Sequence, residues 1–71
     1  MIDYSTFTDE ALAARLADVR QDHADLDAAI TALAGSHLPD MMLIGRLKRK
    51  KLALKDEIAK IEDYLNPDII A

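Results

Sequence analysis

The sequence predicts an all-α fold, an antiparallel two-helix hairpin of coiled-coil type, from two observations. Apolar residues recur at alternating spacings of four and three in both halves of the chain, which is typical of a coiled-coil seam. Only about five residues separate the two halves, and so short a connection forces neighbouring helices to run antiparallel. With 71 residues and no cysteine, the chain has room for one domain, 1–71, without disulfides.

The first helix is expected over about 8–34. Thr8 is a suitable N-cap, because its hydroxyl can accept from an amide of the first turn, and Asp9 and Glu10 place negative charge at the positive end of the helix. Gly35 can end the helix in the left-handed conformation that glycine tolerates. The seam of this helix consists of Leu12, Leu16, Val19, His23, Leu26, Ile30 and Leu33.

The second helix is expected over about 40–65, after a loop at 35–39. Asn66 and Pro67 end it, because the residue before a proline is disfavoured in the α conformation, and a short apolar tail follows at 66–71. The seam of this helix consists of Ile44, Leu47, Lys51, Leu54, Ile58, Ile61 and Leu65.

The register of the hairpin has two solutions. Facing residues of an antiparallel pair have a constant sum of residue numbers, and the seam fits sums of 74 and of 77. Charge pairing of Arg15 with Glu57 and of Asp22 with Lys50 gives 72, which favours the lower value. The usual alternation of a and d layers along a coiled coil favours the higher value. The sequence therefore leaves both registers open.

Either register brings His23 within about one helical turn of Lys51 and makes the middle of the seam polar. This polar seam is interpreted as a register lock, in which the lysine stem packs and its ammonium reaches solvent. The other interpretation is a pH-sensitive contact. No metal site is expected, because the second histidine, His37, lies in the loop and no carboxylate–histidine set faces it.

One flank of the hairpin carries small side chains that would let another helix pair approach closely. We expect a homodimer through this flank, as a four-helix bundle, although the sequence does not separate a dimer from a higher oligomer. The other interpretation is that the alanines are helix-forming surface residues. Leu52 argues against it, because leucine suits open solvent poorly. The candidate dimer face is Ala13, Ala17, Ala24, Met41, Gly45, Leu52 and Ala59.

Six cations lie within ten residues of the second helix in a chain with a net charge of −4. This basic stripe, 46–55, suggests binding to nucleic acid or an anionic membrane surface. The opposing interpretation is pairing within the hairpin, for example of Asp27 with Lys48. No aromatic residue interleaves the stripe to stack on bases, so neither nucleic acid nor membrane is the favoured partner.

One set of cations lacks an obvious counter-charge. The pairing that joins Asp27 to Lys48 places Arg20 opposite Lys55, beside Lys51. Like charges in this arrangement are destabilising unless an anion neutralises them. We therefore expect a site for an anion or for a partner's carboxylate at Arg20, Lys51 and Lys55.

Two stretches resemble a known family. His23–Ile30 reads HADLDAAI and Leu47–Ile58 reads LKRKKLALKDEI. They resemble the YdcH-like family of small bacterial proteins, with its pattern H-x-x-L-D-x-x-I followed by L-K-x-x-K-L-x-L-K-D-x-I, over roughly residues 12–65. The resemblance implies a short cytoplasmic helical hairpin without an established biochemical activity and without catalytic residues to transfer.

Both ends of the chain are apolar and meet at the same end of a hairpin. They are expected to pack together over the seam near Leu12 and Leu65, and the alternative is a docking motif for another protein. The residues concerned are Ile2, Tyr4, Phe7, Ile69 and Ile70.

The sequence predicts a non-catalytic, homo-oligomeric protein-interaction or scaffold module with an unidentified partner. No cofactor, metal or small-molecule substrate is expected, because neighbouring carboxylates lack a cleft and no nucleophile–base set or phosphate loop is present. The N-terminus lacks a signal-peptide pattern and no apolar run is long enough to span a membrane, so a cytoplasmic location is expected. The alternative is an anion binder that uses the basic stripe.

Overall fold

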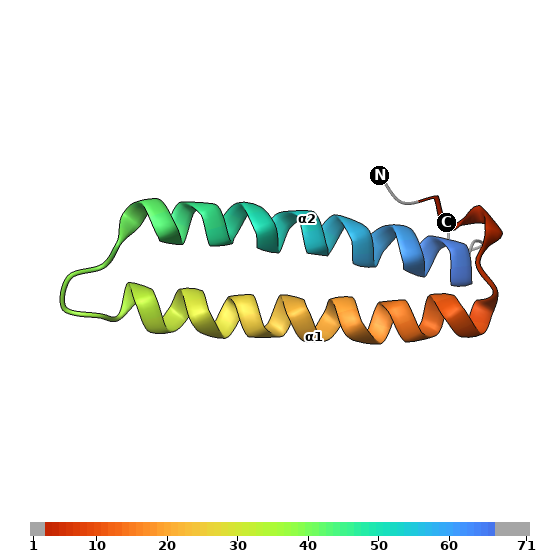
Figure 1. Ribbon diagram of the computed structural model, residues 1–71, viewed down its shortest axis with the longest axis horizontal. Coiled ribbons are helices and arrows are strands. Elements are labelled where there is room, and N and C mark those ends of the chain that lie inside the picture. Colours follow the sequence, from red (N-terminus) through yellow and green to blue (C-terminus); the bar gives the residue numbers. More distant parts are fainter. Residues whose placement is uncertain (1–2, 67–71) are drawn as a thin grey trace.

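Two long antiparallel helices form the molecule. The computed structural model describes residues 3–66, which contain a short 3₁₀ helix η1 (Tyr4–Thr6) and the α-helices α1 (Asp9–Ala34) and α2 (Met41–Leu65). The α-helices lie side by side in a rod of 45 × 25 × 18 Å, with η1 at the end opposite the loop (Figure 1). The predicted all-α hairpin is therefore confirmed, and residues 3–66 contain no strand.

Side-chain caps fix where both helices begin. The Thr8 hydroxyl accepts a hydrogen bond of 3.1 Å from the Ala11 amide, as predicted. The carboxylate of Asp40 does the same for α2, accepting 3.0 Å from the Leu43 amide. Each cap satisfies an amide that has no partner inside its helix, so the loop delivers the chain into α2 at a defined residue.

Gly35 ends α1 without the left-handed conformation that the sequence predicted. Its φ of −85° and ψ of 0° lie in the right-handed region, so that expectation was wrong. The chain ends the helix with hydrogen bonds instead: the Gly35 amide donates to Thr31 O at 3.1 Å and the Ser36 amide donates to Leu33 O at 3.2 Å. These bonds satisfy carbonyls of the last turn, so no special backbone geometry is required.

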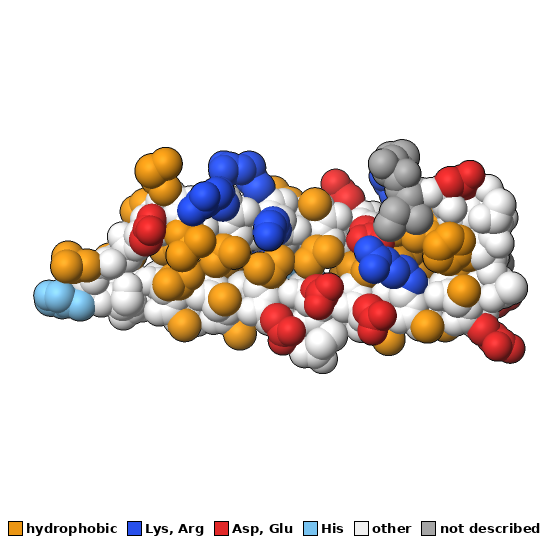
Figure 2. Space-filling view, viewed as in Figure 1, with side chains coloured by type: hydrophobic (Ala, Val, Ile, Leu, Met, Phe, Trp, Pro, Cys, Tyr) orange, Lys and Arg blue, Asp and Glu red, His pale blue; other side chains and the backbone are white. Residues whose placement is uncertain are grey.

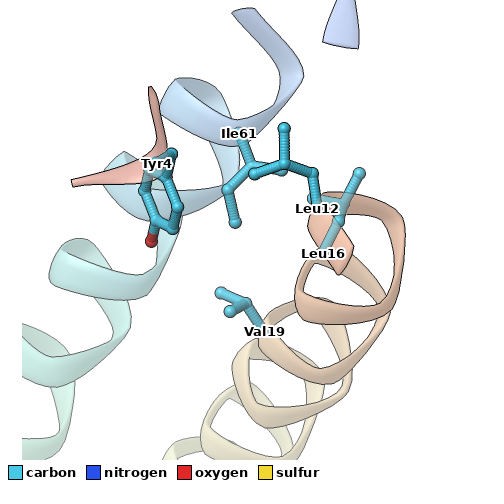
Figure 3. Close-up of a cluster of buried hydrophobic side chains, with 5 residues drawn as sticks. All are labelled: Tyr4, Leu12, Leu16, Val19 and Ile61. Carbon is cyan, nitrogen blue, oxygen red and sulfur yellow. The ribbon is translucent and has the colours of Figure 1, made fainter. Parts of the chain in front are cut away.

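The core follows the predicted seam and has one additional residue. Tyr4 is the additional residue, and the other buried residues are Leu12, Leu16, Val19, Ile30, Ile44 and Ile61. Figure 3 shows that Tyr4, Ile61 and the α1 side chains converge at the end of the hairpin where the chain enters α1. The remaining seam leucines are only half-buried, because two helices cannot enclose a seam on all sides.

The N-terminal segment closes this end of the core. Tyr4 is 4% exposed and packs edge-on against Phe7 and Tyr64, with ring centroids 5.4 and 6.0 Å apart. For Tyr4, the predicted packing over the seam is confirmed. Phe7 contacts Tyr4 but stays 38% exposed, and the remaining residues named for this packing, Ile2, Ile69 and Ile70, lie outside the described residues.

Cross-helix ion pairs support the higher of the two registers. Arg15 precedes the seam residue Leu16 and pairs with Glu57, so the residue numbers add to 72. Arg20 follows the seam residue Val19, on the opposite flank, and its pairing with Glu62 gives 82. The seam runs midway between the two flanks, so it corresponds to 77. The charge argument for 74 identified a real pair, but that pair belongs to one flank and not to the seam.

Candidate interaction surfaces

The residues predicted for the dimer face are open to solvent. Leu52 is 60% exposed and Met41 is 67% exposed, which is unusual for large apolar side chains. Gly45 is partly covered, and a Cβ built on it would meet only the Arg49 guanidinium, at 3.9 Å. The four alanines of the face are exposed: Ala13, Ala17, Ala24 and Ala59. This alanine flank therefore has small and apolar side chains that, apart from Gly45, are exposed within residues 3–66.

Two ion pairs run along the inner edge of the alanine flank. The Arg20 guanidinium contacts Glu62 at 2.5 Å, and the Lys51 ammonium contacts Asp27 at 2.8 Å. Arg20 and Asp27 are seven residues from each other and so lie on the same side of α1. A helix pair approaching this flank would meet charges that are already paired, which lowers the desolvation penalty of covering them.

These pairs change the environment of the predicted anion site. The expectation that Arg20 faces Lys55 without a counter-charge is wrong, because Arg20 pairs with Glu62. Lys51 is also paired, with Asp27, and its hydrogen bond lowers the pKa of the Asp27 carboxyl. The predicted partner of Asp27, Lys48, is replaced by Lys51. Two of the three cations thus have carboxylates within the chain, and the physical reason for a bound anion there is lost.

The polar seam is present, although its two residues do not bind each other. His23 and Lys51 are both half-buried in the middle of the hairpin. The Lys51 side chain is 32% exposed and directs its ammonium to Asp27 at the flank. This is the geometry expected of a lysine whose stem packs while its charge reaches the surface. No buried side-chain nitrogen or oxygen within residues 3–66 lacks a partner, so the polar seam leaves no unsatisfied group.

The basic stripe splits into a paired and an unpaired part. Lys51 forms an ion pair, whereas no ion pair within residues 3–66 involves the four cations closer to the loop: Arg46, Lys48, Arg49 and Lys50. All four are exposed. The predicted pair of Asp22 with Lys50 is absent; both residues instead border a groove. The four cations closer to the loop form one group on the first half of α2, which we term the basic collar. Lys55, the sixth cation of the stripe, also forms no ion pair within residues 3–66 but lies beyond Lys51.

That groove lies between the two helices and was not foreseen from the sequence. It is a shallow hollow of about 510 Å³ with an apolar floor and a charged rim. Leu26, Ala53 and Leu54 form the floor, and Asp22, Asp25 and Lys50 form the rim. An apolar stripe is visible between the helices, with acidic side chains gathered along α1 (Figure 2). The seam leucines predicted as core are the signal that could have revealed it, because a two-helix seam stays open on its sides.

A polar cluster joins η1 to both helices. The Tyr4 hydroxyl donates to Glu57 Oε2, which also accepts from Arg15 Nε at 2.8 Å. Burial would raise the pKa of the Glu57 carboxyl, but the hydrogen bonds from Tyr4 and Arg15 outweigh it and hold this pKa below its ordinary value. Burial and the bond to Glu57 raise the pKa of Tyr4. The sequence predicted the Arg15–Glu57 pair but not the third member, Tyr4.

Residues 3–66 contain no group of three or more His, Cys, Asp or Glu side chains placed to hold a metal ion. Neither α1 nor α2 combines the length and apolar character that a membrane-crossing helix needs.

The fold and these surfaces define a small helical-hairpin protein, and comparison identifies its family. The family described as Protein of unknown function (DUF465) matches residues 16–62, which is more than half of the chain. The chain therefore belongs to this small bacterial family, which includes the YdcH-like proteins, and the predicted resemblance is confirmed. No curated protein and no solved structure matched the chain.

Proposed function

We propose that the chain is a non-catalytic cytoplasmic interaction module that forms a homodimer through the alanine flank, as a four-helix bundle. The observation that carries this proposal is Leu52, which is 60% exposed on the outer side of α2 between the small residues Gly45 and Ala59. The same flank carries Met41 and four exposed alanines, and small and apolar side chains of this kind suit close helix packing. The open seam supports the same conclusion, because a second hairpin would add the burial that two helices lack.

A symmetric dimer is the simplest arrangement for this flank. Most homo-oligomers have two-fold symmetry, in which the same patch of both subunits meets itself. The ion pairs of Arg20 with Glu62 and of Lys51 with Asp27 would border that contact. A different protein partner would bind to the surface of this dimer or in the groove between α1 and α2.

The mass of the protein in solution tests the dimer. We expect light scattering during gel filtration to give twice the chain mass, and Leu52→Glu to give the single-chain mass. Met42→Glu is the matched control, because Met42 is 82% exposed on another side of α2. The proposal fails if the wild type elutes as a single chain at high concentration, or if both variants behave alike.

Gly45→Ala provides a second and independent test. In a lone hairpin this change should raise stability by about 0.8–1 kcal/mol, since alanine is the better helix former and its Cβ meets only Arg49. In the proposed dimer the added methyl group stands between two close helices and should raise the dimer dissociation constant. Tighter dimerisation of Gly45→Ala would contradict close packing at this position.

Anion binding by the basic collar is the second candidate. It is favoured by the four exposed cations that lack ion-pair partners within residues 3–66. A column of immobilised heparin tests it, because retention that falls steeply with salt indicates phosphate or sulfate binding. Elution in the void volume at low salt would exclude this candidate.

A further inference from the structure

We propose that the loop end of the hairpin docks on the surface of an anionic membrane, with Leu38 and Met42 inserted and the basic collar on the lipid headgroups. Leu38 is 85% exposed and Met42 is 82% exposed, and they are the two most exposed large apolar side chains of the described residues. The sequence shows a basic stripe without interleaved aromatic residues, and its pattern did not single out the apolar side chains beside it. The structure places exposed apolar side chains at the loop end next to that stripe.

The apolar and cationic side chains share one continuous surface. A shallow hollow of about 450 Å³ is lined by the apolar residues Met41 and Met42, by the cations Arg46 and Arg49, and by Gly45 and the cap residue Asp40. Figure 2 shows the same neighbourhood, with apolar side chains at the loop end and Lys and Arg side chains on the adjoining turns of α2. Met41 also belongs to the alanine flank, so the proposal rests on Leu38 and Met42, which are independent of the dimer contact.

The spacing along α2 fits the depth of a lipid headgroup layer. Arg46 and Lys50 follow Met42 by four and eight residues, so they stand roughly 6–12 Å behind it at 1.5 Å per residue. Side chains that bind at an interface insert about 5–10 Å into the boundary between headgroups and acyl chains. With the hairpin upright on the surface, the tip would reach this boundary while the long cationic side chains contact phosphates.

The shape and charge of the tip favour a lipid surface over a protein groove. The end of a narrow rod is convex and meets a flat surface without needing a complementary shape. The chain has a net charge of −4, yet the rod is 45 Å long. Charges are screened over about 8 Å at physiological salt, so the acidic far end is shielded from the surface and the collar dominates. Asp40 is the acidic residue nearest the tip, and its carboxylate caps α2.

Binding to vesicles tests the proposal. We expect the protein to float with vesicles of phosphatidylcholine and phosphatidylglycerol at low salt, less at high salt, and not with phosphatidylcholine alone. Replacing Arg46 and Arg49 by glutamine should weaken binding about fivefold for each charge. Lys60→Gln is the matched control, because Lys60 is an exposed cation nearer the other end of α2. Equal losses for the collar and control variants would overturn the proposal.

A tryptophan at the tip reports insertion directly. The chain contains no tryptophan, so Leu38→Trp gives a single emission signal. We expect a blue shift on addition of anionic vesicles, and weakened binding for Met42→Gln but not for the control Leu52→Gln. Circular dichroism should show that every variant keeps its helices, because the changed side chains are exposed.

Other occupants of the tip would give different results. Retention on heparin without flotation would show a polyanion site at the collar alone. A concentration-dependent blue shift without vesicles would show that a second copy covers the tip. Either result would overturn the membrane proposal. Both measurements are repeated with Leu52→Glu, because dimerisation through the alanine flank, which includes Met41, would itself depend on concentration.

Discussion

At the scale of single residues, the cluster of Tyr4, Arg15 and Glu57 is the most constrained polar feature of the hairpin. The Glu57 side chain is 16% exposed and receives hydrogen bonds from both partners, whereas Arg15 is 39% exposed. Solvent screens the exposed side of the Arg15 pair, so its own contribution to stability is small. The greater effect comes from Glu57, because removing it leaves the Tyr4 hydroxyl without an acceptor in a buried position.

We expect Glu57→Gln to lower the free energy of unfolding by about 1–2 kcal/mol at neutral pH, because a neutral amide oxygen accepts weaker hydrogen bonds from Tyr4 and Arg15 than the carboxylate does. The folded state holds the pKa of Glu57 below its ordinary value of 4.5. Its contribution is therefore complete above pH 4.5 and is lost as the pH falls through the lower folded value. Urea unfolding between neutral and acidic pH measures both effects. Glu62 supplies the control, because its side chain is 46% exposed, and Glu62→Gln should change stability by less than about 0.5 kcal/mol.

Tyr4→Phe should alter the opposite limb of the pH profile. The pKa of Tyr4 is raised above its ordinary value of 10.0, so its contribution is complete below pH 10.0 and is lost as the pH rises through the folded value. The phenylalanine variant cannot ionise and should lose less stability in alkaline solution than the wild type. Circular dichroism measures the stability of the two proteins at alkaline pH. If both lose stability equally, the Tyr4 hydroxyl is not held by Glu57.

Gly35→Ala is expected to stabilise the hairpin. Gly35 has a φ of −85°, which alanine adopts freely, and a Cβ there would come no closer than 3.5 Å to another atom. The change restricts the unfolded chain and should add about 0.4–1 kcal/mol to the free energy of unfolding. Urea titration of the two proteins measures this gain. A loss of stability would mean that the turn needs the left-handed conformation that the sequence suggested.

At the scale of elements, the two ends of the hairpin differ in how well they are packed. Tyr4 and Ile61 complete a closed cluster at the end with η1, where Ile61 has no exposed surface. Toward the loop, Ile30 and Ile44 are buried but neighbouring leucines stay half-exposed. Local stability follows the density of buried contacts, so the helices should open from the loop end.

This asymmetry predicts unequal responses to mutation and to hydrogen exchange. Ile61→Ala should lower the free energy of unfolding by about 2–4 kcal/mol, because it leaves a cavity in a closed cluster. Leu47→Ala should have a smaller effect, about 1 kcal/mol, because Leu47 is half-exposed. Amide exchange should be slower around Val19 than around Leu33. Two results would contradict the difference in packing between the two ends: uniform amide exchange along α1, or a larger loss of stability for Leu47→Ala than for Ile61→Ala.

At the scale of the whole molecule, the hairpin is longer and thinner than a compact domain. Its radius of gyration is 14.9 Å, whereas about 11 Å is expected for a compact chain of this length. An elongated two-helix protein exposes a large share of its seam, and association is the general way for so small a chain to gain burial. The open seam therefore favours the proposed dimer.

A dimer would make stability depend on protein concentration. We expect the midpoint of thermal unfolding to rise with concentration, because association stabilises the folded state by about 2.7 kcal/mol when the partner exceeds its dissociation constant a hundredfold. Leu52→Glu should remove this dependence while leaving helical content unchanged. A midpoint of the wild type that is constant over a wide concentration range would contradict the homodimer.

The hairpin, the seam residues and the N-cap at Thr8 could be predicted from the sequence, because heptad spacing, a short connection and a capping hydroxyl act locally. The partners of Arg20 and Asp27, the burial of Tyr4 and the exposure of Leu38 and Met42 emerged only in the folded hairpin. Those features depend on how far one helix is shifted along the other and on what covers its end. The two registers differ by three in the sum of facing residue numbers. This difference changes which charges meet but leaves the apolar periodicity of each helix the same, so only the assembled hairpin could distinguish the two registers.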